Sequence, residues 1–305
     1  MNFYTSALTK INSNSVVALG CFDGVHVGHS KIISEAVSTA REKSLVSVVW
    51  SFQVPPRSVL SNDDAPSVLT SQAEKKRLIR ALGVDLLVSV KFNEKIAQMS
   101  PRDFFKKILM ERLCAKHIFC GFNYRFGHKG SGDVTLLRAL CEEFNVALTV
   151  IDEIEADGVT VSSSAIRSYL LDGNLDSAKK MLGRPFSVYG KVKDGQHLGR
   201  VLGFPTINQD VPNGKMLLKN GVYLTRIRLG RSIKYGITNI GMRPTVNSTE
   251  PVCETHIFDF DGNLYGKYLT VEFIKFLRSE RRFNSLEELT AQIARDVEVA
   301  KEYID

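Results

Sequence analysis

Short apolar runs alternate with amphipathic segments along the first half of the chain. The runs at 16–19, 46–52, 85–90, 117–120 and 147–151 have the length and the β-branched content of buried strands. Segments with helical periodicity lie between them, from about Gly28 and over 72–82, 101–113 and 134–143. This order predicts a parallel sheet covered by helices, so we expect an α/β Rossmann-like domain of the nucleotide-binding type.

The alternation ends before Arg184, and a different pattern follows. Serines at 162–164 offer N-cap hydroxyls to a helix that runs to about Leu171, and a second short helix ends at Gly183. The next segments are rich in β-formers and are separated by Gly and Asn: 187–192, 222–229, 233–240, 254–260 and 268–276. They predict a small antiparallel barrel or sandwich. We therefore expect two domains, residues 1–184 and 185–305.

A final amphipathic helix is expected after Ser285. Glu288 stands three residues beyond this serine, which is the spacing of a capping box. Apolar residues then recur at helical spacing to about Ala300, so the chain closes with a helix that has one apolar face.

The composition is that of a folded, soluble protein. Of the 305 residues, 44% are hydrophobic and 24% are charged, which argues against disorder and coiled coil. The longest apolar runs fall short of the roughly 18 residues of a membrane span. The five cysteines form no C-x-x-C pair, which argues against a zinc site and a disulfide framework. The first residues lack the features of a secretion signal. We therefore expect a cytoplasmic protein with free thiols.

The net charge of +7 is spread over both predicted domains. The residues from 185 on carry 17 of the 40 basic and 14 of the 33 acidic side chains, which leaves 23 and 19 for the first domain. Without a polybasic segment, such a weak positive field suits phosphate-bearing small molecules. We expect neither nucleic acid nor a membrane as partner, and the sequence does not indicate an oligomeric state.

The stretch G-C-F-D-G-V-H-V-G-H at 20–29 joins the first predicted strand to its helix. Oriented N–H groups at such a junction bind phosphate, and Gly24 and Gly28 allow a ligand to approach the backbone. His26 and His29 lie three residues apart and point the same way on a helix, where both can donate to phosphoryl oxygens. The alternatives are that they cap a loop or bind a metal. Phosphate chemistry is favoured because strand, glycines and helix start coincide.

Two further segments of the first domain are candidates for the same site. Ser163 and Ser164 stand at a predicted helix start with Arg167 one turn later, a second anion grip, although a serine cap with a solvent-facing Arg is common. The loop at 121–127 carries Asn123 and Arg125 among aromatic residues. Its rings can line a planar ligand or simply pack.

In the second domain, a glycine-rich segment at 190–203 leads into P-T-I-N at 205–208. It fits no Walker pattern, but a loop containing Gly199, Arg200 and Gly203 can cradle phosphates. The oxygens of Thr206 and Asn208 can then place Mg²⁺. The alternative is that the glycines mark ordinary turns.

Glu254 is the acidic residue of this domain that most needs an explanation. It stands in a predicted strand that is otherwise apolar and aromatic, so its carboxylate requires a partner or a chemical task. A structural salt bridge is the alternative to a catalytic role.

These segments together resemble the bacterial bifunctional riboflavin kinase/FMN adenylyltransferases, or FAD synthetases. H-x-G-H at 26–29 and S-S-S-A-I-R at 162–167 look like the two signatures of the nucleotidyltransferase superfamily, and F-D-G-V-H at 22–26 is typical of its flavin branch. The resemblance implies that ATP is held by Asp23, His26, His29, Ser163, Ser164 and Arg167. It also implies that Asn123 and Arg125 face FMN.

The second domain resembles the riboflavin kinases of this family. P-T-I-N at 205–208 looks like their P-T-A-N motif, and the segments at 239–245, 254–260 and 276–280, the last with Arg278, also follow the family. The resemblance implies a six-stranded antiparallel barrel. It also implies that Thr206 and Asn208 are the Mg²⁺ and nucleotide ligands and that Glu254 is the general base.

One position departs from the family. Where relatives carry T-F-x-P-H-P after the second strand, this chain has S-F-Q-V-P-P at 51–56, so Pro55 replaces a histidine. A donor group near the nucleotide is therefore missing, and slower or altered adenylyl transfer is the alternative that this raises. The core signatures are intact, so we interpret the first domain as active. The resemblance implies that the protein makes FMN from riboflavin and MgATP, and FAD from FMN and ATP. The alternatives are a riboflavin kinase with a weakened first domain, and a flavin- or RNA-binding regulator.

Overall fold

A computed structural model describes residues 1–6, 9–56, 67–194, 199, 202–230, 232–244 and 249–304. The chain divides into two compact units, Met1–Ser163 and Ser164–Asp305. Each unit is described by itself below. The predicted domain boundary at 184/185 stays a prediction.

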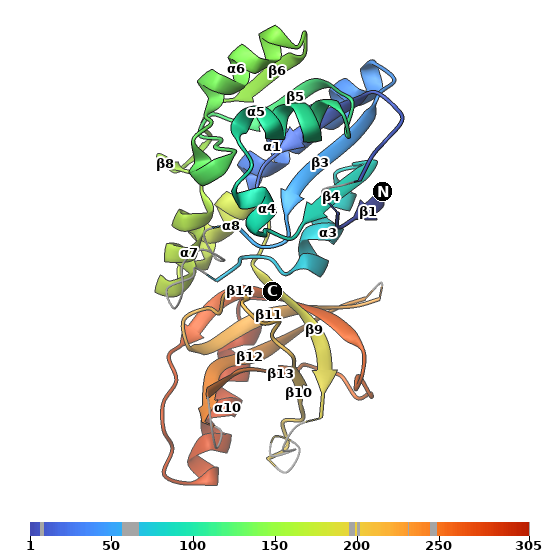
Figure 1. Ribbon diagram of the computed structural model, residues 1–305. Helices are drawn as coiled ribbons and strands as arrows, with labels where there is room; N and C mark the ends of the chain where they lie inside the picture. The colour runs from blue at the N-terminus through green and yellow to red at the C-terminus, as the bar shows by residue number, and fades with distance from the viewer. Residues whose placement is uncertain are drawn as a thin grey trace. The chain divides into compact units, whose positions relative to one another are not determined.

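The first unit is built on six parallel strands in the order β1-β4-β3-β2-β5-β6 (Figure 1). Their bounds are Asn2–Tyr4 (β1), Ser15–Leu19 (β2), Val46–Phe52 (β3), Leu86–Val90 (β4), Ala115–Gly121 (β5) and Ala147–Ile151 (β6). The expected α/β sheet is confirmed; β1, which pairs with β4 at the sheet edge, was not anticipated because its three residues carry little pattern. The chain moves outward from β2 to β3 and β4, then returns to β5 on the other side. Ligands bind such sheets where this reversal occurs, at the carboxyl ends of the strands.

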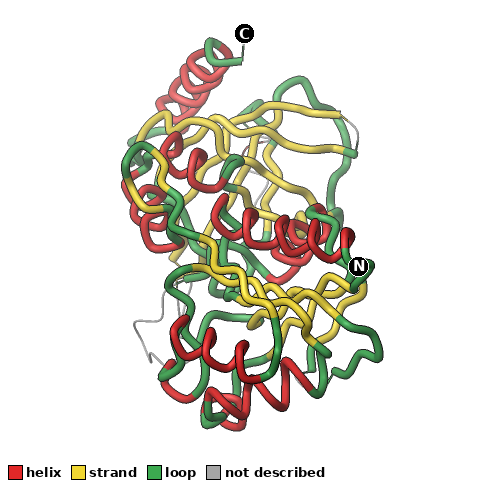
Figure 2. Tube along the Cα trace, turned by 90° about the horizontal axis from the view of Figure 1, so that it is seen from above, coloured by secondary structure: helices red, strands yellow, loops and turns green. Residues whose placement is uncertain are grey.

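Helices cover both faces of this sheet (Figure 2). Alternate residues of β2 face opposite sides, so that Val16 and Ala18 join one core and Val17 and Leu19 the other. The first core is covered by α1 (Val27–Glu42) and α3 (Gln72–Ala81), and the second by the helical segment 104–110 and by α6 (Val134–Glu143). Short elements complete the unit: α4 (Glu94–Ala97), α5 (Pro101–Asp103), η2 (His128–Gly130), β7 (Glu155–Ala156) and β8 (Val159–Thr160).

The helix expected over 101–113 has an unusual geometry. It begins as α5 and continues as a π-helix, η1, over Phe104–Met110. The wider turn buries Phe104, Phe105, Ile108 and Leu109 together against the sheet. π-turns are frequently found at functional sites, and Phe104 lines a pocket described below.

The second unit begins with two short helices, α7 (Ser163–Asp172, which starts at the last residue of the first unit) and α8 (Leu175–Leu182). α8 ends at Gly183 in the left-handed conformation (φ 69°), as the sequence indicates. A closed barrel follows, in which six antiparallel strands take the order β10-β13-β12-β11-β14-β9 and β9 pairs back with β10. The expected barrel is confirmed. Its strands are Ser187–Lys193 (β9), Thr206–Gln209 (β10), Gly221–Leu229 (β11), Ser232–Pro244 (β12), Thr249–Ile257 (β13) and Tyr268–Arg278 (β14).

The two faces of the barrel wall have different partners. Alternate residues such as Tyr223 and Thr225 are fully buried, and the hydroxyls of Thr225, Thr238 and Thr255 bond in sequence at 2.8 Å. On the other face, Val222, Leu224 and Ile237 pack with Ala300 of the final helix, α10 (Leu286–Lys301). This outer face, beside α10, carries the site residues described below.

The start of α10 differs in one detail from the predicted capping box. Ser285 Oγ accepts a hydrogen bond from Glu288 N at 3.2 Å, as expected of an N-cap. The Glu288 carboxylate, however, accepts from Asn284 N at 3.0 Å. Glu288 therefore holds the residue before the cap.

No helix among the described residues is both long enough and apolar enough to cross a membrane.

Candidate active sites

The loop between β2 and α1 has a strained backbone. Phe22 (φ 50°), Gly24 (φ 83°) and Val25 (φ 41°) all adopt positive φ, which is costly for a β-branched residue such as Val25. The loop lies at the carboxyl end of β2, where the strand order reverses between β2 and β5. Strain of this kind is retained where the surrounding structure over-determines it, most often at functional sites.

His26 and His29 lie together at the start of α1. Their rings stack with centroids 3.5 Å apart, and Phe22 contacts His29 edge-on at 5.3 Å. His26 is the N-cap residue, and its Nδ1 accepts a hydrogen bond from His29 N at 3.3 Å. In the neutral ring the proton is therefore on Nε2, which makes Nε2 a donor. The capping role considered for these residues is thus real for His26.

Asp23 and Gly24 fix the loop to the segment that precedes α3. The Asp23 carboxylate is buried and accepts from Leu69 N (2.9 and 3.1 Å) and Thr70 N (3.2 Å). Gly24 N donates to Thr70 Oγ1 at 3.1 Å, and Ser163 Oγ donates to Asp23 O at 2.9 Å. These contacts shape the loop; the role of Asp23 as an ATP ligand stays a prediction. Packing also favours glycine at position 28, because a Cβ there would lie 3.3 Å from the His26 ring.

Lys75 of α3 donates a hydrogen bond to the same loop. Its side chain is 1% exposed, and Nζ donates to Cys21 O at 3.0 Å and to Phe52 O at 2.8 Å. The ammonium thus ties the loop after β2 to the end of β3. Burial lowers the pKa of Lys75, and the nearby Asp23 charge opposes this shift.

The lowered pKa of Lys75 predicts how stability depends on pH. Below the folded-state pKa the ammonium is charged in both states and its burial is fully costly. As the pH rises toward 10.5, the pKa of the unfolded chain, the folded protein releases this proton first, so the cost is relieved. We expect the unfolding free energy of the wild type to gain on that of Lys75→Met between pH 7 and 10, as measured by urea denaturation. Lys76→Met, at the exposed neighbour, is the control; a difference that stays flat or falls would contradict the prediction.

A largely apolar pocket of about 780 Å³ opens beside this loop. Its wall combines the ends of several parallel strands with the loop after β5. The aromatic residues of the wall are Trp50, Phe52, Phe92, Phe104, Tyr124 and Phe126. Gly20, Cys21, Pro55, Pro56 and Arg125 also line it. Tyr124 and Phe126 stack with centroids 5.8 Å apart, and burial raises the pKa of Tyr124, so its hydroxyl stays neutral. This shape and lining suit a planar aromatic ring.

Of the two predicted FMN-facing residues, Arg125 lines this pocket and Asn123 does not. Arg125 is exposed, lines the pocket and lies 3.9 Å from Asp133. Asn123 is exposed on the same loop but is not part of the pocket wall. Pro55, which replaces the family histidine, is in the wall beside Pro56. The position therefore contributes an apolar surface here instead of a donor.

Ser164 and Arg167 belong to the second unit, on the first turns of α7. Their predicted contact with ATP stays a prediction. Ser163 is the last residue of the first unit, where its hydroxyl contacts the Asp23 carbonyl as described.

The second unit has a pocket of about 680 Å³ between the outer barrel face and the start of α10. Its wall contains predicted site residues, namely Gly199, Thr206, Glu254 and Arg278. It also contains residues that the sequence did not single out, among them Asn239, His256 and Asp296. Charged and apolar groups thus converge in one cavity, as expected of a binding site.

Strand register brings Glu254 to the predicted magnesium ligands. In the β10–β13 pair, Asn208 stands opposite Glu254 and Thr206 opposite His256. In the β12–β13 pair, Asn239 stands opposite Glu254 from the other side. Residues two apart share a face of a strand, so Thr206 and Asn208 present their oxygens on the same side. Asn208 is not itself part of the pocket wall.

The glycine-rich loop is described in part. A Cβ at Gly199 would lie 2.4 Å from Phe204 O and 3.1 Å from Thr206 Oγ1, so this position requires glycine for a close approach. Gly203 adopts φ 82° with open space around it. Arg200 lies outside the described residues.

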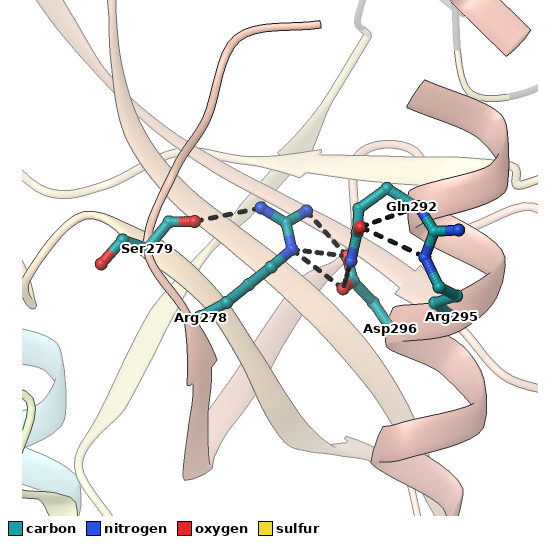
Figure 3. A network of polar contacts seen from close by, with 5 residues as sticks. All are labelled: Arg278, Ser279, Gln292, Arg295 and Asp296. Carbon is teal, nitrogen blue, oxygen red and sulfur yellow. Dashed lines mark hydrogen bonds and ion pairs between the residues drawn. The ribbon is translucent and has the colours of Figure 1, made fainter. Parts of the chain in front are cut away.

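Arg278 is held in the pocket wall by an acidic residue of α10 (Figure 3). Its Nε donates to both Asp296 oxygens at 2.9 and 3.0 Å, and Nη2 donates to Oδ2 at 2.7 Å. Nη1 donates to Ser279 O, and Gln292 Nε2 donates to Asp296 Oδ1. The Asp296 side chain is 5% exposed. A bidentate pair of this kind fixes the plane of the guanidinium.

We expect Asp296→Asn to impair the chemistry of this pocket. The amide cannot pair with two guanidinium donors, so Arg278 loses its orientation, and a misplaced binding group costs roughly ten- to a hundredfold in rate. The readout is the rate of ATP-dependent turnover in this pocket, with Glu298→Gln, an exposed change on the same helix, as control. A wild-type rate for Asp296→Asn would contradict the prediction.

Two family models match the chain. The model for FAD synthetase matches residues 8–165, and the model for riboflavin kinase matches residues 182–304.

Curated proteins are similar over nearly their whole length. The bifunctional riboflavin kinase/FMN adenylyltransferase of Escherichia coli (strain K12) is 37% identical over 289 residues, covering 94% of this chain and 92% of that protein. The protein of the same name from Buchnera aphidicola subsp. Schizaphis graminum is 36% identical, covering 98% of this chain and 96% of its own. That of Bacillus subtilis (strain 168) is 35% identical and covers 95% and 93%.

A solved structure has the same fold. The crystal structure described as a macrolide-efflux protein from Streptococcus pneumoniae has a TM-score of 0.88 and 29% identity, and the match covers 98% of both chains.

Proposed function

The chain belongs to the bifunctional riboflavin kinase/FMN adenylyltransferase family, and we propose how its residues divide the two reactions. It phosphorylates riboflavin to FMN with MgATP, and it adenylylates FMN to FAD with release of pyrophosphate. The observation that carries this conclusion is that both family models match, one mainly on the parallel-sheet unit and the other on the barrel. A role in macrolide efflux does not follow for this chain, because both family models and the curated relatives name flavin enzymes.

In the kinase reaction, Glu254 acts as the general base. It takes the proton from the ribityl 5′-hydroxyl of riboflavin as that oxygen attacks the γ-phosphorus of ATP, and ADP leaves. Its support is the place of Glu254 in the barrel pocket, opposite Asn208 in register. The ion pair of Arg278 and Asp296 lines the same cavity.

The oxygens of Thr206 and Asn208 suit Mg²⁺. They are hard oxygen donors on one face of β10, and Mg²⁺ commonly takes one or two protein oxygens together with substrate phosphates. Mg²⁺ held there would supply positive charge to the transferring phosphates. Among the described residues, no group of three or more His, Cys, Asp or Glu could hold a metal ion.

In the adenylyl transfer, the FMN phosphate attacks the α-phosphorus of ATP and pyrophosphate leaves. This displacement requires no nucleophile from the protein. His26 and His29 donate to the phosphoryl oxygens on which charge builds up, and the start of α1 adds its N–H groups and dipole. The aromatic pocket beside the loop receives the flavin ring, near Arg125. The support is the stacked pair of histidines at the end of β2, where the strand order reverses.

Chromatography of flavins tests the assignment of both reactions. Purified protein is incubated with ATP and Mg²⁺, once with riboflavin and once with FMN, because the two substrates separate the two sites. We expect FAD from both incubations, which would show that Pro55 is compatible with adenylyl transfer. FMN from riboflavin without FAD from either would leave a riboflavin kinase with a silent first unit, and absence of turnover in both would leave a flavin-binding protein.

The remaining assignments concern location and partners. The five cysteines are free thiols, which supports a reducing, cytoplasmic location. The even distribution of charge supports small phosphate-bearing substrates over nucleic acid. A filter-binding titration with RNA that showed affinity falling steeply with salt would overturn the second assignment.

A further inference from the structure

His256 holds the backbone of the predicted magnesium-binding segment. Its Nδ1 lies 3.0 Å from Pro205 O, the carbonyl of the peptide that leads into Thr206. Thr206 stands directly opposite His256 in the β10–β13 pair. The imidazole therefore contacts the short strand β10 at its first peptide, where the strand leaves the glycine-rich loop.

A second contact holds the same segment from the loop. Phe204 N donates to Gly199 O at 2.8 Å, and a Cβ at Gly199 would collide with Phe204 O and crowd Thr206 Oγ1. The segment 204–206 is thus hydrogen-bonded to Gly199 through Phe204 N and to His256 through Pro205 O. β10 has only four residues, so few ladder bonds fix its start without these contacts.

The hydrogen bond defines the tautomer of His256. A carbonyl oxygen only accepts, so Nδ1 carries the proton and donates. The ring is also bounded edge-on by Phe204 at 5.4 Å and by Phe258 at 5.9 Å. His256 therefore makes two kinds of contact, a hydrogen bond from Nδ1 and packing of its ring. Substitutions can remove one and keep the other.

We propose that His256 is a positioning residue of the kinase site, which fixes Thr206 for Mg²⁺ and nucleotide through the hydrogen bond from Nδ1 to Pro205 O. Its place in the pocket wall, two residues from Glu254 on the same face of β13, puts this bond beside the reacting groups. The inference rests on the proposed role of Thr206 as a ligand of the MgATP complex. It predicts that His256 acts on MgATP binding through its donor and not through its ring.

Three substitutions separate the donor from the ring. His256→Ala removes both, His256→Phe keeps an aromatic ring between Phe204 and Phe258, and His256→Asn keeps an N–H at the atom bonded to Cγ. We expect KM for MgATP in FMN formation to rise about tenfold or more in the Ala and Phe variants, equivalent to about 1.4 kcal/mol. The Asn variant is expected to stay within about threefold of wild type, and KM for riboflavin to change little in all three. Conversion of FMN to FAD by the same preparations is the internal control.

The outcomes are distinguishable. A wild-type KM in the Phe variant, or an Asn variant as impaired as Ala with its fold intact by circular dichroism, would overturn the donor role. Thr206→Ala is measured alongside: if it leaves KM for MgATP unchanged, the assignment of Thr206 fails, whatever His256 does. Wild-type protein that makes no FMN at all would instead overturn the assigned kinase reaction.

A measurement on the unaltered protein avoids any folding defect. Nitrogen NMR of the imidazole side chains at pH 8 distinguishes the two neutral tautomers, and His256→Asn identifies the signal of His256 among the six histidines. We expect His256 with the proton on Nδ1. A proton on Nε2 would overturn the proposal, because that ring cannot donate to Pro205 O.

Discussion

Glu254→Gln is expected to lower FMN formation from riboflavin by about 10² to 10⁴, because it removes the group that accepts the proton of the attacking hydroxyl. Glutamine keeps the size of the side chain, so the pocket and its packing persist. The rate of ADP and FMN release under saturating MgATP is the measurement, and kcat falls much more than KM changes.

Two controls separate chemistry from folding in this variant. The same preparation is given FMN, and its conversion to FAD should match that of the wild type. Glu298→Gln removes one exposed carboxylate on α10 and should leave both rates unchanged. A near wild-type rate of FMN formation in Glu254→Gln would show that another group, or water, receives the proton.

His29→Ala is expected to lower FAD formation from FMN by about 10² to 10³, the usual effect of removing one donor that stabilises transition-state charge. The substitution also removes the ring that stacks on His26, while the backbone N–H of residue 29, which donates to His26 Nδ1, is kept. FMN formation from riboflavin should be spared. The measurement is single-turnover formation of FAD with radiolabelled ATP.

The control for this substitution is another histidine of the first unit. His117 stands in β5 near the end opposite the pocket, where its Nε2 lies 2.8 Å from Thr149 Oγ1. His117→Gln keeps a polar partner for Thr149 and should leave FAD formation unchanged. Loss of FMN and FAD formation together in His29→Ala would indicate misfolding in place of a catalytic effect.

Elements with strong local patterns could be predicted from the sequence. The strands of the parallel sheet are continuous apolar runs, and the H-x-G-H spacing places two rings on one side of a helix start, where they stack. The pairing of strands across the barrel could not be predicted, because register depends on loops and on the barrel closure. Asn239 and His256 reach the pocket through that register, so no local pattern singled them out.

Other features depend on contacts that one segment cannot show. Lys75 stands in a charged stretch and looks solvent-facing, yet two carbonyls from other strands and loops make its burial possible. β10 begins after a proline and is too short to show alternation. The π-helix at 104–110 has the same apolar spacing as an α-helix, and only its i→i+5 backbone hydrogen bonds, such as that from Glu111 N to Lys106 O, reveal it.

Trp50, in the wall of the aromatic pocket, is the single tryptophan of the sequence and is 3% exposed. Its emission therefore reports on the first unit alone, shifting to longer wavelength when water reaches the indole. Circular dichroism reports on both units. In a denaturant titration, coincident curves from the two signals would mean that the units melt as one cooperative block, and separated curves would give each unit its own midpoint. The protein thus carries a built-in optical label with which the energetic independence of its two halves can be measured without any dye.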